Sequence, residues 1–453
     1  MKAILRFLRQ TISVIQMTLP KIGIGWMFAL LTSNFNRVAI HELGILAVLI
    51  TAMLALYQFL APFQVAFGRM ADRHPIFGFR RGPYLFTGLL ISAIVFPFLP
   101  DVAVAMGDGS ILAIFAGFAL LTIFGVGFAM AGNAHLALIV DNTEEKSRGI
   151  TIALVWAVQI ISIIISASVI KRIMPVYDIE SMQQLYNLTI PIVLISTVAS
   201  LIFNEKRLTQ AGRETVLETS LRETPEGSII TMTINLLQSH ETTRNFFWFI
   251  ILSTMGVFLQ DNILEVFGAE VFGMTVAETT SFQQLWGGGV LLSMMLVGII
   301  TMLRPFNKQS ITLIGSVATA GGLCLLTFTS TMENQALLNP ALFILGLGTG
   351  VYTIGALSVM MKLTTTGAVA TYMGLWGMAQ SFGSGFSSFF AGALHSSIIG
   401  TGLMAPAQGY GAIFFFEAFL MLWGAWMLLQ VSVKGFQEDL NRSDLEFAME
   451  MGA

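Results

Sequence analysis

Long runs of apolar residues, separated by short polar connections, dominate the pattern along this chain. A transmembrane helix needs about 20 apolar residues to cross the hydrocarbon core of a bilayer, and this length predicts twelve helices in the 453 residues. The pattern is that of an all-α membrane protein. The fourth range is long enough to predict a tilted helix or one that continues beyond the membrane. The predicted helices cover 22–40, 44–68, 83–101, 110–140, 149–171, 187–204, 245–267, 281–303, 310–331, 338–362, 367–395 and 409–433.

A polar stretch between the sixth and seventh predicted helices divides the chain into two halves. Its run NEKRLTQAGRETVLETSLRETPEG, which starts at Asn204, mixes charges of both signs and predicts a solvated linker. We therefore expect an N-terminal six-helix bundle at 1–204, a cytoplasmic linker at 205–243 and a C-terminal six-helix bundle at 244–453.

The lysines and arginines set the expected orientation, because positively charged loops stay on the cytoplasmic side of a membrane. Of 23 lysines and arginines, only Arg37, Lys171 and Arg172 fall on the side assigned as external. Both termini are therefore expected in the cytoplasm. The basic segment 1–10 is followed by no small-residue cleavage site after a short apolar core, so it predicts a retained N-terminus and not a signal peptide.

Composition agrees with a membrane protein and narrows the function. Hydrophobic residues make up 55% of the chain and charged residues 11%, whereas soluble domains carry about 25% charged residues. The net charge of -3 argues against nucleic acid as a partner, and the single cysteine, Cys324, excludes a disulfide framework. The glycine-rich run GLGTGVYTIGAL at 346–357 predicts tight helix packing, not nucleotide binding. HExxH, P-loop and GxSxG motifs are absent, and we expect no enzyme.

The connection between the second and third predicted helices concentrates four arginines in FGRMADRHPIFGFRRGPY, residues 67–84. Its glycine allows helices to approach closely, and its aspartate and arginines can pair across helix ends, so it would act as a cytoplasmic latch. The plainer interpretation is a positively charged anchor. Together with the six plus six helices, the sequence resembles the helix 2–3 connection of the major facilitator superfamily. The matching positions are Gly68, Asp72, Arg73, Arg80 and Arg81.

Five further stretches carry a more specific resemblance. They are NRVAIHELG at 36–44, APFQVAFGRMAD at 61–72, LQDNILEVFGAEVFGMTVAETT at 259–280, GLGTGVYTIGALSVMM at 346–361 and YGAIFFFEAFL at 410–420. These stretches resemble the PucC-like bacteriochlorophyll-delivery family, whose members are light-harvesting assembly factors of phototrophic bacteria. The resemblance runs from the first predicted helix to the last, and it implies a major facilitator fold.

This resemblance implies chlorophyll or bacteriochlorophyll as cargo or ligand, and no reaction. It implies light-harvesting or photosystem apoproteins as partners, with pigment-synthesis enzymes as further candidates. The expected location is the inner, intracytoplasmic or thylakoid membrane of a phototrophic bacterium. On this basis we expect a pigment carrier and assembly factor.

Two alternatives stay open: a secondary transporter of a small solute, and a non-transporting scaffold for antenna assembly. A solute transporter usually needs ionisable groups near the middle of the membrane. The predicted helices hold few acids, of which Glu417 is the clearest. That scarcity favours a hydrophobic cargo, whereas the sequence does not separate a scaffold from a carrier.

Three of the five histidines, His41, His135 and His395, lie at or near membrane depth. The magnesium of a chlorophyll accepts an axial ligand, most readily a neutral imidazole. We expect His135 as this metal ligand, with Asn133 beside it on the same helix, because polar groups inside a span are costly. The alternative is a hydrogen bond between helices. Weaker candidates are Gln58, Gln159, Asn34 and Gln380.

The two halves also align with each other. NRVAIHELG superposes on QDNILEVFG at an offset of 224 residues, which places Arg37 on Asp261 and His41 on Glu265. In the fold that the chain resembles, the first and seventh helices are symmetry mates that meet near the external side. A charge in the outer bilayer needs a partner or water. We therefore expect Arg37 to pair with Asp261 or Glu265 as an external gate; the alternative is that each charge reaches the interface separately.

Overall fold

The computed structural model describes residues 11–61, 63–143, 145–202, 204–205, 207–209, 241–303, 307–363 and 369–431. These residues are helical almost throughout, and the one β-bridge among them joins Ile76 to Phe79. The basic segment 1–10 and most of the predicted linker lie outside the described residues.

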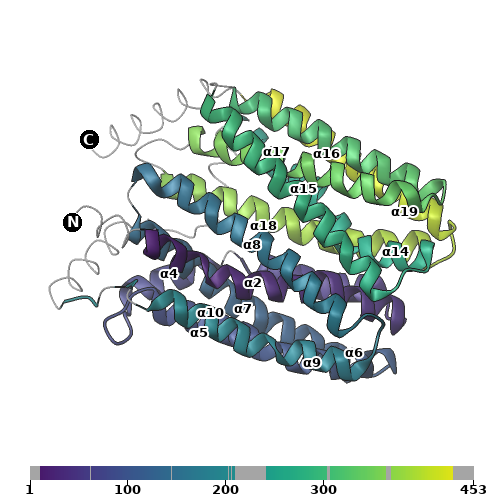
Figure 1. Cartoon of the computed structure of the whole chain (residues 1–453), viewed down its shortest axis with the longest axis horizontal. Coiled ribbons are helices and arrows are strands. Elements are labelled where there is room, and N and C mark those ends of the chain that lie inside the picture. The colour runs from purple at the N-terminus through teal and green to yellow at the C-terminus, as the bar shows by residue number, and fades with distance from the viewer. Residues whose placement is uncertain are drawn as a thin grey trace.

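The N-terminal half forms a bundle of helices, several of which are broken into shorter elements (Figure 1). Its elements are α2 (Pro20–Ala29), η1 (Leu30–Phe35), η2 (Val38–Glu42), α3 (Ala47–Phe59), α4 (Phe63–Arg73), α5 (Gly82–Val95), η3 (Phe96–Phe98), α6 (Leu99–Gly107), α7 (Ile111–Asn142), α8 (Glu145–Ile173), α9 (Ile179–Asn187) and α10 (Thr189–Leu201).

The C-terminal half forms a second bundle beside the first. Its elements are α13 (Glu241–Phe258), η4 (Gln260–Asn262), α14 (Leu264–Phe272), α15 (Val276–Leu303), α16 (Lys308–Thr331), η5 (Gln335–Leu337), α17 (Leu338–Leu363), α18 (Val369–Leu394), η6 (His395–Ile399) and α19 (Pro406–Leu429).

Capping residues set several of these boundaries. The Ser110 hydroxyl accepts a hydrogen bond of 3.3 Å from the Ala113 amide at the start of α7. The Asn307 side chain accepts one of 3.1 Å from the Gln309 amide at the start of α16. At the end of α14, Gly273 adopts the left-handed conformation, with φ 63°, which costs little without a Cβ atom.

The described residues contain nine helices that are long and apolar enough to cross a membrane. The bent pair α13–α14 raises this number to ten, and α3 is a shorter apolar helix. Each of the twelve ranges predicted from the sequence coincides with helix in the described residues. The prediction of an all-α membrane protein is therefore confirmed, while the count of twelve transmembrane helices stays a prediction.

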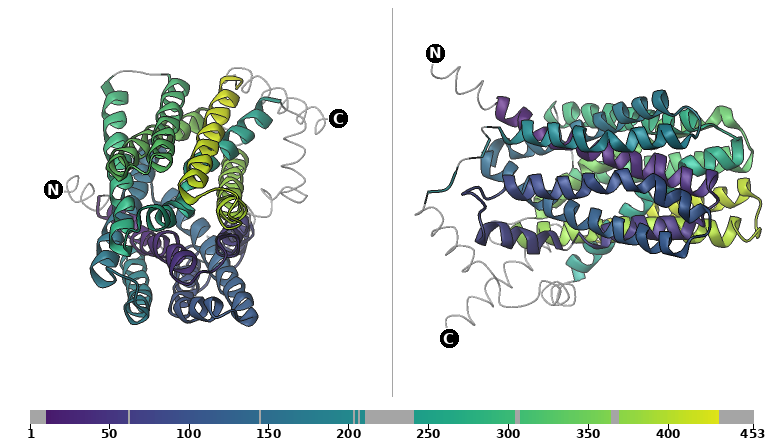
Figure 2. Two further views of the ribbon diagram at one scale, coloured as in Figure 1. Left: turned by 90° about the vertical axis from the view of Figure 1, so that its right-hand side faces the viewer. Right: turned by 90° about the horizontal axis from the view of Figure 1, so that it is seen from below.

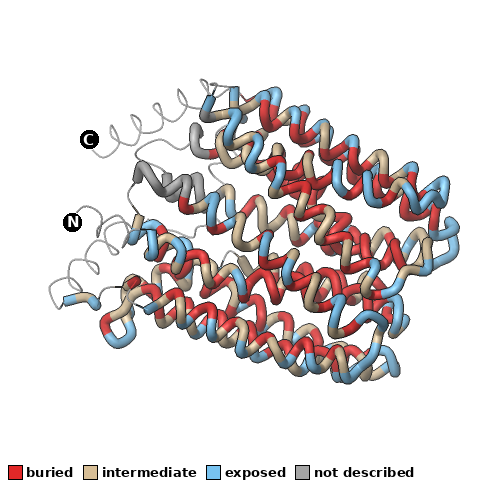
Figure 3. Tube along the Cα trace, in the orientation of Figure 1, coloured by how far each residue is buried: buried red, intermediate tan, exposed pale blue. Residues whose placement is uncertain are grey.

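Each half packs around a hydrophobic core, and the two cores reach across the seam: Val266 and Val276 join the N-terminal one and Ile160 the C-terminal one. Figure 2 shows the two bundles from the end and from below, lying side by side, and Figure 3 shows the buried residues gathered inside them. The seam between the halves brings α3 against α18 and α8 against α15.

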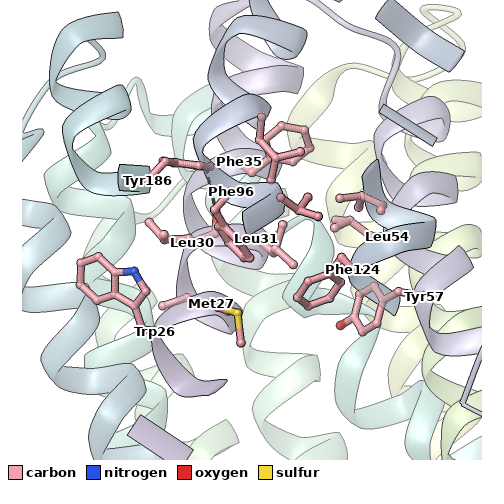
Figure 4. Close-up of a cluster of buried hydrophobic side chains, with 14 of the residues drawn as sticks. Trp26, Met27, Leu30, Leu31, Phe35, Leu54, Tyr57, Phe96, Phe124 and Tyr186 are labelled. Carbon is pink, nitrogen blue, oxygen red and sulfur yellow. Dashed lines mark hydrogen bonds between the residues drawn. The ribbon is translucent and has the colours of Figure 1, made fainter. Parts of the chain in front are cut away.

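Aromatic residues with hydrogen-bonded polar atoms hold the N-terminal core together (Figure 4). The Trp26 indole donates a hydrogen bond of 3.0 Å to Thr189, and the Tyr186 hydroxyl donates one of 3.3 Å to the Leu30 carbonyl. The rings of Phe96 and Phe124 meet edge to face at 5.8 Å. The polar atoms of both Trp26 and Tyr186 thus have partners, which avoids the cost of burying them alone.

Glycines of α17 allow its backbone to touch its neighbours, as the run GLGTGVYTIGAL predicts. A Cβ at Gly346 would overlap the carbonyl of Trp286 in α15, and one at Gly348 would overlap the amide of Thr319 in α16. The prediction of tight helix packing is confirmed for this run.

The two ends of the molecule's long axis carry different connections. The terminus end is where the described chain begins at Thr11 and finishes at Val431, with the 74–81 loop beside them. The far end carries the opposite connections, which include 43–46, 273–275 and 400–405.

Candidate functional site

Irregular helical turns gather toward the far end. The first helix changes from α to π geometry at η1 and again at η2, and α18 continues into a third π segment, η6. The seventh predicted helix breaks at the 3-10 turn η4, where α13 and α14 meet with a bend of 44°. π turns often occur at functional sites, and broken helices line the ion and substrate sites of many transporters.

Polar side chains at these turns join the two halves. The Ser33 hydroxyl donates a hydrogen bond of 2.9 Å to Oε1 of Glu265, and the Asn36 amide donates one to the carbonyl of Asn262. Arg37 Nη2 donates one of 2.9 Å to the carbonyl of Met274. All three donors are buried, with at most 1% of each residue exposed.

Further hydrogen bonds between the halves lie nearby. The Val48 amide donates to the Ser396 hydroxyl at 3.1 Å, and the Ala277 amide donates to the Pro175 carbonyl at 3.0 Å. Lys171 Nζ donates to the Ser281 hydroxyl at 2.9 Å. This structure is therefore closed at the far end.

The predicted ion pair of Arg37 with Asp261 or Glu265 is wrong in this conformation. Arg37 instead contacts Glu42 in the same half, with Nη1 2.6 Å from Oε1. Glu42 follows Arg37 on the same π turn, so the guanidinium reaches it without crossing between the halves. Asp261 accepts its hydrogen bond from its neighbour Gln260. The halves do meet at the predicted place, but through hydrogen bonds.

Three carboxyl groups lie buried in the C-terminal half beside this junction: Asp261 is 4% exposed, and Glu265 and Glu417 are 0% exposed. Oε1 of Glu417 accepts a hydrogen bond of 2.9 Å from the Gln260 amide. Oε1 of Glu265 accepts a second bond, of 3.0 Å, from Gln283. The expected scarcity of intramembrane acids does not hold at this place.

His395, a predicted pigment ligand, belongs to a second cluster at the far end. Its Nε2 lies 3.1 Å from Oε2 of Glu270, which also accepts a hydrogen bond of 2.9 Å from the Tyr410 hydroxyl. Only 6% of His395 is exposed. Its Nδ1 has no hydrogen-bond partner but is buried, so a macrocycle has no open space above the ring, and His395 does not fit pigment ligation in this conformation.

His135, the predicted metal ligand, is buried in the same way. Its Nε2 makes a hydrogen bond of 2.7 Å with the Met17 carbonyl, and 3% of the residue is exposed. The alternative interpretation, a hydrogen bond between helices, describes this geometry. The prediction that His135 ligates magnesium does not fit this conformation.

The other ligand candidates differ in their accessibility. His41 is exposed at the far end, and Asn133 is half-buried against Gly68. Gln58 is half-buried, and its amide donates a hydrogen bond of 2.7 Å to the Tyr57 hydroxyl. The weaker candidates Gln159, Asn34 and Gln380 accept hydrogen bonds from Lys21, Tyr186 and Trp376.

The arginine-rich loop forms an ion-pair network at the terminus end. Oδ1 of Asp72 lies 3.2 Å from Arg80 Nε and 2.9 Å from Arg81 Nη2, which confirms the predicted pairing for these two arginines. A Cβ at Gly68 would lie 2.7 Å from Oδ1 of Asn133, so the predicted close approach of α4 to its neighbour α7 is also confirmed. This network lies within the N-terminal half, and its role as a latch stays a prediction.

Two acids of this network were not predicted. Oδ2 of Asp141 lies 3.2 Å from Arg80 and 3.3 Å from Arg81. The Glu205 carboxylate accepts hydrogen bonds of 2.5 to 2.6 Å from the backbone amides of Arg80, Arg81 and Gly82 at the start of α5. The sequence did hold a signal for both acids: each follows a long predicted apolar helix, on the side of the membrane where the arginines lie.

Comparison with known proteins gives a consistent result over nearly the whole chain. The family model described as "PUCC protein" matches residues 34–436. The chain is 27% identical to the "Bacteriochlorophyll synthase 44.5 kDa chain" of Rhodobacter capsulatus, over 92% of this chain and 94% of that one. It is 26% identical to the "Protein PucC" of Cereibacter sphaeroides, over 90% of each chain.

Solved transporters share the fold. A POT family transporter in complex with a thioalcohol-conjugated peptide superposes with a TM-score of 0.66 at 15% identity, covering 91% of this chain and 95% of that one. The xylose transporter XylE from E. coli, in a partially occluded inward-open conformation, gives 0.64 at 14% identity, covering 91% and 98%. These similarities show the major facilitator fold, but they do not identify a substrate.

Proposed function

The chain belongs to the PUCC protein family, and from this membership we propose that it is a (bacterio)chlorophyll-binding carrier and assembly factor. It supplies pigment to light-harvesting or photosystem apoproteins and catalyses no reaction. The family match over residues 34–436 is the observation that carries the proposal. A relative whose name links it to bacteriochlorophyll synthase supports a pigment as the cargo.

Gln58 is the pigment ligand that suits the geometry best among the candidates. It is half-buried at the end of α3, beside the seam with α18. The adjacent Phe59 ring meets the rings of Phe382 and Phe386 from the other half at 6.2 and 5.4 Å. The amide oxygen of Gln58 would ligate the magnesium, and the aromatic rings would pack against the flat macrocycle.

The proposed partner proteins and the proposed cellular membrane follow from the role as a pigment carrier. The apoproteins would receive pigment from this chain, and pigment-synthesis enzymes would load it. Such a protein works in the inner, intracytoplasmic or thylakoid membrane of a phototrophic bacterium, with both termini in the cytoplasm. The absence of Lys and Arg from the connections at 268–280, 332–337 and 396–408 supports this orientation.

The test is the absorption spectrum of the full chain, purified in mild detergent from pigment-making cells. We expect a chlorin band with a fixed pigment-to-protein ratio. Gln58→Leu should lower that ratio, while Gln430→Leu, at an exposed glutamine at the end of α19, should leave it unchanged. Folded wild-type protein without any chlorin band would overturn the proposal.

A second candidate function is proton-driven transport of a small solute. The buried carboxyls Asp261, Glu265 and Glu417 favour it, because ionisable groups inside a membrane protein commonly mark transport pathways. Two measurements distinguish the two functions. Uptake of solute driven by a pH gradient, by pigment-free protein in vesicles, would support the second function. Pigment bound in a fixed ratio to protein from pigment-making cells would support the first.

A further inference from the structure

Two buried acids at the far-end junction each pair with a glutamine amide in an incomplete way. Gln260 Nε2 donates a hydrogen bond of 2.6 Å to Oδ1 of Asp261. The remaining oxygens of the pair, Gln260 Oε1 and Asp261 Oδ2, are buried and have no hydrogen-bond partner. The two residues are 1% and 4% exposed, so bulk water does not satisfy these oxygens.

The second pair repeats the pattern with residues from different helices. Gln283 Nε2 donates a hydrogen bond of 3.0 Å to Oε1 of Glu265. Gln283 Oε1 and Glu265 Oε2 are again buried without a partner, and the residues are 2% and 0% exposed. Each pair therefore has two buried oxygens without a hydrogen-bond partner, and each pair lacks one hydrogen-bond donor.

A proton on the acid supplies the donor that each pair lacks. An ionised carboxylate and an amide oxygen can only accept hydrogen bonds, whereas a protonated carboxyl donates one O–H. A carboxylic acid and a primary amide then form two hydrogen bonds, N–H to the acid carbonyl and O–H to the amide carbonyl. Exchanging the amide oxygen and nitrogen of either glutamine does not help, because it only relocates the surplus acceptor.

The neighbouring acids favour the neutral form of both acids, whereas Arg37 favours ionised Glu265. Arg37, from the opposing half, is within electrostatic reach of Glu265 but already contacts Glu42. Tyr57 and Glu417 are the groups within electrostatic reach of Asp261 from α3 and α19, and Glu265 is the one from α14. Like charges this close disfavour simultaneous ionisation.

A second group of titratable side chains lies nearer the far end. Glu270, about one turn beyond Glu265 on α14, interacts there with His395, Tyr410 and His41.

The geometry fits protons better than a metal ion. Each acid is engaged by its own glutamine, Asp261 by Gln260 and Glu265 by Gln283. Within the described ranges, no three His, Cys, Asp or Glu side chains converge where an ion could be held. A hard cation needs six or more oxygen ligands around one point, whereas a proton needs one donor oxygen and one acceptor.

We propose that Asp261 and Glu265 are proton-binding sites, occupied when the molecule is closed at the far end and released when that end opens. Ser33 of the opposing half donates to Glu265, so opening removes this contact and admits water that stabilises the carboxylates. The closed conformation then binds more protons than the open one. Low pH favours closure, and the closed-to-open ratio changes by up to about tenfold per pH unit for each proton bound.

Infrared absorption tests the occupancy directly, because the C=O stretch of a protonated carboxyl is separate from the bands of a carboxylate. Full-length protein at neutral pH should show this band, and Glu265→Gln and Asp261→Asn should each reduce it. Glu180→Gln is the matched control, since Glu180 is exposed at the same end. A missing band, or a band that neither buried substitution reduces, would mean ionised acids bridged by water and would overturn the proposal.

Spin labels on cysteines at Val176 and Leu403 test the linkage to conformation. Both residues are exposed at the far end, one in each half, and the background carries Cys324→Ala. In wild-type protein the closed population should rise as pH falls. Glu265→Gln should stay closed with a weaker pH dependence, because its amide supplies the donor permanently.

The control Glu180→Gln should titrate like the wild type. A wild-type population that is independent of pH, or one that Glu265→Gln leaves unchanged, would contradict the proposal. Neither measurement requires pigment, so failure here leaves the proposed function standing, and an absent chlorin band leaves the proton sites standing.

Discussion

Arg81 contacts two carboxylates at once. Its Nη2 lies 2.9 Å from Asp72 and its Nε 3.3 Å from Asp141, and 8% of its side chain is exposed. The two acids come from α4 and α7, so the guanidinium ties these helices to the start of α5. Losing one acid leaves the arginine with the other, and the network should weaken without collapsing.

Asp72→Asn should therefore lower stability by only about 1 kcal/mol, because the pair is partly exposed to water. We expect normal insertion into the membrane, a lower melting temperature and reduced antenna assembly. Asp108→Asn, at an exposed acid of the far end, is the control. Antenna levels equal to the wild type would reduce the loop to an anchor that only sets orientation.

For single residues, the sequence predicted the contacts of a side chain where its partners lie in the same loop. The pairing of Asp72 with Arg80 and Arg81 spans one loop. The partner of His135 is the carbonyl of Met17, 118 residues away. Neither the hydropathy nor the spacing of residues predicts a contact between such distant positions. Arg37 is an exception, because its partner Glu42 is close along the chain but was not among the predicted partners.

At the scale of helices, close packing depends on single missing side chains. The backbones of α5 and α7 meet where Gly88 faces Gly127, and a Cβ at Gly88 would lie 2.6 Å from the Gly127 carbonyl and 2.7 Å from the Ala131 amide. Both are backbone atoms, which cannot rotate away. These helices must separate if Gly88 is replaced.

Gly88→Ala should cost about 1–3 kcal/mol, the usual range for an overpacked contact. Gly321→Ala is the matched control, because that glycine is also inside a helix but a methyl group added there would meet no atom within 4 Å. The melting temperature of this control in the same detergent should stay unchanged or rise. Equal melting temperatures for both variants would contradict the role of Gly88.

Hydropathy predicted where helices lie but not how they bend. All twelve predicted ranges coincide with helix in the described residues, because apolar length is a property of the sequence alone. The 44° bend between α13 and α14 contains neither proline nor glycine at Gln260–Asn262. The Asn262 side chain donates to the Phe258 carbonyl, and the backbone amide of Gln260 donates to Glu417 in α19. The contact with Glu417 is tertiary, and helical periodicity does not predict it.

On the scale of the whole molecule, the two halves are separate bundles joined along a seam. Each half has its own main core, and hydrogen bonds at the far end join Val48 to Ser396 and Ala277 to Pro175. The resemblance to the major facilitator fold predicted that the first and seventh helices meet, and the internal offset of 224 residues matched their residues. It could not predict which atoms touch, because π turns shift the register of the first helix.

A disulfide across the far end separates a carrier from a static scaffold. Cysteines at Val48 and Ser396, in a Cys324→Ala background, should lock the halves in the closed state on oxidation. If the protein must open to release pigment, oxidation should abolish antenna assembly and reduction should restore it. Single-cysteine variants control for oxidation elsewhere, and full assembly by the locked protein would support the scaffold.

Most donors at the far-end junction are neutral, as at Ser33, Asn36 and the Ala277 amide, and the one charged donor there that is buried, Arg37, has its ion pair within its own half. Dissolved ions screen exposed charges over about 8 Å at physiological ionic strength; they therefore act on the exposed Lys171–Ser281 contact and little on the buried ones. The balance between the open and closed conformations should therefore change little with salt concentration. A phototroph carrying this protein could meet changing salinity without readjusting it.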